Sequence, residues 1–175
     1  MVRFLTWSPL VCTGSRWLCI GMEYLVLKWI HIVSSTVLFG TGIGLAFFYF
    51  AAHRMEDLAA IKFATRIVVL GDFIFTTPSG FIQIISGTLL IWQAGWTLDA
   101  TWLWIALVLF AFAGACWLPV VWLQIKMHKI ARDATDLSQL PVVYWRYFRQ
   151  WVLLGSLAFP ALLAMFLLMI AKPTF

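Results

Sequence analysis

Charged residues are scarce in this sequence. Asp, Glu, Lys and Arg make up 11% of the 175 residues, and hydrophobic residues make up 63%. Soluble domains carry about 25% charged residues, and a chain of this length cannot bury so much apolar surface in its own core. The mean hydropathy of the chain is +0.96, and we infer that the solvent around it is lipid. This composition excludes soluble enzymes and disordered regulators, and it makes the lipid bilayer the first partner.

Motifs for metal clusters and for nucleic acid are also absent. Cys12, Cys19 and Cys116 form neither CxxC nor CxxCH, which excludes a zinc ribbon and covalently attached c-type haem. The basic residues behind the net charge of +5 are scattered between apolar runs. No nucleic-acid partner is therefore expected. No repeat or low-complexity linker divides the chain.

Long uncharged stretches define the organisation of the chain. They cover residues 29–53, 73–98, 100–125 and 150–171. Each reaches the ~20 residues that a helix needs to cross the hydrocarbon, and each is apolar on all sides, which excludes strands. The sequence predicts an all-α, four-transmembrane-helix bundle in residues 22–175, with helices near 24–51, 66–93, 101–127 and 145–171. Residues 1–21 have too short an uncharged run to span and are predicted to be a mobile leader or a misassigned start.

Lysine and arginine set the predicted orientation. The first and third loops hold eight of them: Arg54, Lys62, Arg66, Lys126, Lys129, Arg132, Arg146 and Arg149. The second loop has none, and the C-terminus has only Lys172. Because basic loops stay in the cytoplasm, both termini are predicted to be extracytoplasmic, in a bacterial inner membrane.

Polar side chains within the apolar spans are costly and therefore mark candidate sites. In the second span they are spaced 4, 3, 4 and 3, which places them on one helical face: Asp72, Thr76, Ser79, Gln83 and Ser86. Pro78 is expected to kink this helix. The first span has a matching line that starts at His31 and Ser35 and ends at Tyr49. We expect the two faces to meet in the centre of the bundle.

Three residues of these faces carry the functional hypotheses. Asp72 is expected to bond Arg149, Arg146 or Arg66 at the cytoplasmic rim, in a structural pair or with a proton-handling role. His31 is a candidate haem ligand or a hydrogen-bond partner of a nearby serine. Gln83 is expected at a similar depth to His31. His53 and His128 are interpreted as solvated helix ends.

Several motifs in order resemble a known family. They are LKWIHIVSSTVLFGTGIGLAFFYFAAHR (27–54), GDFIFTTPSGFIQIISGTLLIWQAGW (71–96), CWLPVVWLQIKM (116–127) and LPVVYWRYFRQWVLLGSLAFP (140–160). Together they resemble an uncharacterised family of bacterial integral membrane proteins that is defined by a domain of unknown function. The resemblance implies a four-helix inner-membrane protein and no particular activity.

A more distant resemblance involves the first span alone. Leu27-Lys28, His31, a small-residue helix and then His53-Arg54 are similar to the opening of the HemJ-type protoporphyrinogen oxidases. The CopD-like copper-resistance membrane proteins share the general plan. This resemblance implies that His31 is a candidate axial ligand of haem b.

Three function hypotheses follow, and enzymatic activity stays open among them. The first is a b-type haem or quinone-linked redox component, with His31 as ligand and with Ser35 and Gln83 beside it. Its second ligand is unassigned, with Met165 and Met169 as candidates. The second is a non-catalytic accessory or scaffold subunit of a membrane complex or homo-oligomer. The third is a small transporter or metal-handling protein that uses the stripe from Asp72 to Gln83.

Overall fold

The computed structural model describes residues 15–96 and 100–173, and their regular structure is entirely helical. The all-α prediction is therefore confirmed. The elements are α1 (Ser15–Arg54), α2 (Leu58–Gly71), the π-helix η1 (Asp72–Thr76), α3 (Thr77–Gln93), α4 (Thr101–Asp133), the 3-10 turn η2 (Leu137–Gln139) and α5 (Val142–Ala171). α1 begins within the segment predicted as a leader, and residues 1–14 of that segment lie outside the described residues.

Three helical segments are long and apolar enough to cross a membrane: Gly21–Arg54, Thr101–Asp133 and Val142–Ala171. A fourth stretch, made of α2, η1 and α3, runs without a break from residue 58 to residue 93. It begins earlier than the predicted 66 because Asp57 caps it. The Asp57 carboxylate accepts from the backbone N–H groups of Ala59 and Ala60, at 3.1 and 3.3 Å, and these donors have no partner within the helix.

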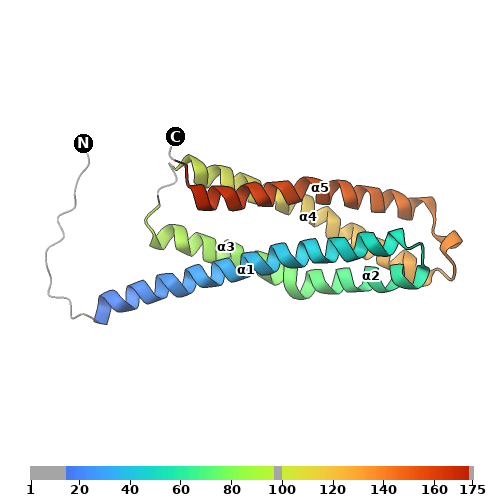
Figure 1. Cartoon of the computed structure of the whole chain (residues 1–175), viewed down its shortest axis with the longest axis horizontal. Coiled ribbons are helices and arrows are strands. Elements are labelled where there is room, and N and C mark those ends of the chain that lie inside the picture. The colour runs from blue at the N-terminus through green and yellow to red at the C-terminus, as the bar shows by residue number, and fades with distance from the viewer. Residues whose placement is uncertain (1–14, 97–99, 174–175) are drawn as a thin grey trace.

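Pro78 distorts the helix just before it. Proline lacks the N–H that would bond the carbonyl four residues back, and its ring crowds that carbonyl. The helix widens just before it, so that the N–H of Thr77 donates to the carbonyl of Asp72, five residues back. The helical path changes direction at this π-helical turn (Figure 1). Such turns often lie at functional sites.

The helices form two groups that pack most extensively against each other at one end of the bundle. α1 packs along α2 and α3, and α4 packs along α5 and against α2. We call the end with Arg54 and η2 the loop end, and the opposite end, with Ser15 and Ala171, the terminal end (Figure 1). The main buried cluster belongs to the loop end and includes Tyr49, Met127 and Tyr144.

Candidate functional site

A polar network ties α1 to α3 at His31. Gln83 Nε2 donates to the carbonyl of His31 at 2.7 Å and to Ser34 Oγ at 3.1 Å, and His31 Nδ1 lies 2.8 Å from Ser86 Oγ. The Ser86 hydroxyl donates its single proton to the carbonyl of Ile82 at 2.5 Å. Nδ1–H of His31 is therefore the donor toward Ser86, which leaves the lone pair on Nε2. The two polar faces meet, as their spacing predicted.

Ser34 takes the place that the sequence interpretation gave to Ser35. The Ser35 hydroxyl donates at 2.7 Å to the carbonyl of Ile32 on its own helix, and it does not join the Gln83 network. Successive residues of a helix point about 100° apart, so a shift of one residue is enough to exchange the two serines. Ser35, which was expected beside His31 together with Gln83, is therefore not part of the network that joins Gln83 to α1.

Asp72 has no arginine partner among the residues that the structure describes. The side chain is 5% exposed, whereas Arg149, Arg146 and Arg66 are exposed at the loop end. The single ion pair among residues 15–96 and 100–173 joins Arg132 to Asp133, at 3.0 Å. Arg149 precedes the buried Trp151 by two positions, about 200° around the helix, and so faces away from the bundle. The predicted Asp72–Arg pair is wrong.

The neighbours of Asp72 are uncharged polar groups from two helices. Thr76 follows it by one helical turn, and Trp117 and Gln124 approach its carboxyl group from α4. Thr76, Ser79, Gln83 and Ser86 are buried together with Asp72. The polar stripe thus faces the interior along its whole length, and Asp72 is its end toward α4.

A cavity of about 700 Å³ opens beside Asp72, between α1, α3, α4 and α5. We call it the Asp72 cavity. Its walls are mainly apolar, with Phe39 and Leu45 from α1 and Phe159 from α5. Asp72 is the only ionisable side chain among the described residues that line it. Both the volume and the apolar lining with a few converging polar groups are typical of ligand pockets.

Polar atoms in the wall of the Asp72 cavity lack hydrogen-bond partners. The buried atoms without a partner in the described part of the chain are Asp72 Oδ2, Thr76 Oγ1, Trp117 Nε1, Gln124 Oε1 and Trp151 Nε1. All five residues line this one cavity. A buried polar atom without a partner costs about 1–3 kcal/mol, and folded proteins contain few of them. Thr76, Trp117 and Gln124 lie around the carboxyl group of Asp72, so these atoms form one polar cluster in the wall of the cavity.

The rim of the Asp72 cavity consists of exposed apolar side chains. Phe47, Phe81 and Leu118 line it and are 66%, 63% and 65% exposed. All three belong to the apolar part of the helices, so their exposed surfaces face lipid. A molecule dissolved in the bilayer can therefore reach the cavity from the side.

His53 is a buried residue that the sequence interpretation missed. It is 5% exposed. Its Nδ1–H donates to the carbonyl of Tyr49 at 2.7 Å, and its Nε2 accepts from the Tyr144 hydroxyl at 2.6 Å. Its ring stacks on Phe148 with centroids 4.1 Å apart. The prediction of a solvated helix end is wrong because the start of α5 covers this histidine. The aromatic run at 144–148 was the available signal.

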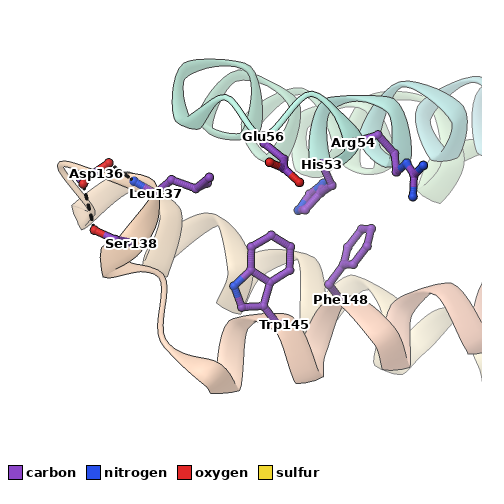
Figure 2. A pocket seen from close by; sticks show the side chains of 8 residues that line it. All are labelled: His53, Arg54, Glu56, Asp136, Leu137, Ser138, Trp145 and Phe148. Atoms are coloured by element: carbon purple, nitrogen blue, oxygen red, sulfur yellow. Dashed lines mark hydrogen bonds between the residues drawn. The ribbon is translucent and has the colours of Figure 1, made fainter.

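A second cavity, of about 880 Å³, reaches His53 at the loop end. Figure 2 shows Glu56 beside the imidazole and Trp145 and Phe148 below it, with the η2 turn closing the far side. Asp136 on that turn accepts from the N–H of Leu137 and from the Ser138 hydroxyl, at 2.6 and 2.9 Å. The polar groups of His53, Asp136 and Ser138 in this loop-end cavity are therefore paired within the chain.

His128 is separate from both cavities. It is half-buried, and its Nδ1 lies 3.3 Å from Thr65 Oγ1. Within the two described ranges, no three side chains of His, Cys, Asp or Glu come together in a way that could hold a metal ion.

One comparison with known proteins gives a match. The family described as "Predicted integral membrane protein (DUF2269)" matches residues 25–173. No curated protein and no solved structure matches the chain. The matched residues contain both cavities and the whole polar stripe.

Proposed function

This chain belongs to that family of predicted integral membrane proteins, and from this premise we propose that it binds a lipid-soluble small molecule in the Asp72 cavity. The observation that carries the proposal is an apolar cavity of about 700 Å³ with one cluster of buried polar groups, centred on Asp72, in its wall. A ligand with an apolar body and a hydrogen-bonding head would satisfy both kinds of surface.

The proposal includes a four-span topology in the bacterial inner membrane. The stretch from residue 58 to residue 93 is helical throughout, with a π-helical turn near Asp72 and Pro78 in its middle, and it would be the fourth span beside the three long helices. The loop end carries the basic residues counted above, so the loop end is cytoplasmic. The Asp72 cavity then lies at the depth of the hydrocarbon.

A cavity-filling variant tests the proposal. A Cβ atom at Gly114, which lines the Asp72 cavity, meets no atom within 4 Å. Gly114→Leu therefore fills the cavity without a clash at its first atom. Gly40 also meets no atom within 4 Å, but it is exposed and lies outside the cavity. Gly40→Leu is the matched control for adding a leucine to a helix.

The measurement is a fluorescence titration of the protein in phosphatidylcholine nanodiscs with N-phenyl-1-naphthylamine, an apolar and uncharged probe. We expect saturable binding to the wild type and to Gly40→Leu, and at least about tenfold weaker binding to Gly114→Leu, since one tenfold step corresponds to about 1.4 kcal/mol. Equal signals from all three proteins and from empty nanodiscs would refute the proposal. A non-catalytic subunit of a membrane complex would give that result.

Haem b at His31 stays a second candidate because Nε2 of His31 has the lone pair that an iron ligand needs. His31 lines neither the Asp72 cavity nor the loop-end cavity, so the geometry supports haem less well than an apolar ligand. A reduced-minus-oxidised visible spectrum of the purified protein, with His31→Ala beside it, tests this candidate. A colourless preparation from haem-sufficient cells contradicts it.

A further inference from the structure

We infer that the ligand of the Asp72 cavity is a lipophilic organic amine, bound as its ammonium ion to the carboxylate of Asp72. This inference rests on the proposed function and names the class of ligand. It starts from the isolation of Asp72: neither Lys, Arg nor His is among the described residues that line the cavity. A carboxylate at membrane depth is neutralised by a charged partner or by a proton, and the described residues of the chain supply no charged partner.

The charge of Asp72, rather than the number of unpaired atoms, favours a cationic ligand. Asp72 Oδ2 as a carboxylate and Gln124 Oε1 accept hydrogen bonds, whereas Thr76 Oγ1, Trp117 Nε1 and Trp151 Nε1 are donors. Thr76 and Trp117 lie beside the Asp72 carboxyl group, but neither carries a charge. An ammonium group carries several N–H donors and can serve both oxygens. A ligand with a carbonyl head, such as a quinone, offers acceptors only. It would leave the charge on Asp72 uncompensated.

The walls of the cavity suit the remainder of such a ligand. Trp117 and Trp151 line it together with phenylalanines from α1, α3, α4 and α5, among them Phe39, Phe81 and Phe110. Aromatic faces attract cations through the ring quadrupole, most strongly when water is excluded. The same rings provide apolar surface for a hydrophobic body. The arrangement thus combines one fixed negative charge with an aromatic enclosure.

Competition with protons follows from the same chemistry. The carboxyl group of Asp72 can bind one proton or one ammonium ion, and not both. Along the cavity wall, η1 contributes Asp72, and α1, α3, α4 and α5 contribute no other titratable side chain among the described residues. Amine binding should therefore weaken as acidity rises, whereas binding of an uncharged ligand should not.

Two probes with the same anthracene body separate charge from shape: 9-(aminomethyl)anthracene, a cation at neutral pH, and uncharged 9-anthracenemethanol. We expect the wild type in phosphatidylcholine nanodiscs to bind the amine at least about tenfold more tightly than the alcohol. Asp72→Asn keeps the side-chain shape and should abolish this preference while still binding the alcohol. Asp133→Asn removes an exposed carboxylate and should change neither affinity.

Each outcome decides a separate point. Equal affinities for amine and alcohol in the wild type overturn the amine inference and leave the proposed function standing. If neither probe binds, the proposed function fails. If Asp72→Asn binds neither probe, the test moves to Asp72→Glu, which keeps the negative charge. A preference of Asp72→Glu for the amine supports the inference, and loss of that preference overturns it.

Discussion

Removing the hydroxyl of Tyr144 should destabilise the loop end by a definite amount. In the structure this hydroxyl donates to Nε2 of His53 at 2.6 Å, and both residues are buried. Tyr144→Phe keeps the ring and its packing, so no cavity is created. It removes only the donor, and the imidazole nitrogen is left without a partner.

The magnitude follows from the cost of an unpaired buried acceptor, about 1–3 kcal/mol. His53 cannot turn to another partner easily, because its Nδ1–H is held by the carbonyl of Tyr49 and its ring is stacked on Phe148. We therefore expect Tyr144→Phe to lower the free energy of unfolding by about 1–3 kcal/mol.

The assay is reversible unfolding in mixed micelles, with increasing dodecyl sulfate, followed by circular dichroism. Tyr147→Phe is the matched control, since Tyr147 is half-buried on the same helix and its ring packs edge-on against Trp122. Its effect should stay within about 0.5 kcal/mol. Equal effects of the two variants would refute the role assigned to the His53–Tyr144 bond.

Two further predictions concern the terminal end and the topology. A Cβ atom at Gly87 would lie 3.2 Å from Cε1 of His31, so Gly87→Ala should displace the imidazole and lower the free energy of unfolding by about 1–3 kcal/mol. Gly80→Ala, where a Cβ atom meets nothing within 4 Å, should be close to neutral, and equal losses in both variants would argue against the His31 packing. The orientation can be tested in whole cells with single-cysteine variants of a background without the native cysteines. A membrane-impermeant maleimide should label Lys172→Cys directly and Lys129→Cys only after permeabilisation. The reverse pattern would show that the orientation is inverted.

The helices and their inward faces could be predicted from the sequence because both depend on local patterns. Apolar runs longer than a bilayer is thick allow few structures besides helices. The 4-3-4-3 spacing from Asp72 to Ser86 defines one face, and the structure buries that whole face. The contact of His31 with the second span follows from the same geometry.

The partners of individual side chains were harder to predict, since they depend on how the helix pairs are placed. His53 is buried only because α5 folds back over the end of α1, and no pattern around residue 53 records that contact. The error at Asp72 arose from assigning partners by depth alone. Depth does not show that Arg149 points away from the interior. The cavity itself results from the divergence of two helix pairs, which no single segment encodes.

Photochemical labelling tests the central claim, ligand binding in the Asp72 cavity, most directly. A diazirine-bearing alkyl probe is irradiated with the protein in nanodiscs, with and without excess N-phenyl-1-naphthylamine, and the labelled positions are located by peptide mass spectrometry. We expect the competitor to protect positions that line the cavity, such as Thr76, Trp117 and Trp151, and to leave lipid-facing Trp92, which is 81% exposed, unprotected. Labelling that the competitor reduces nowhere, or reduces equally at Trp92, would contradict the account.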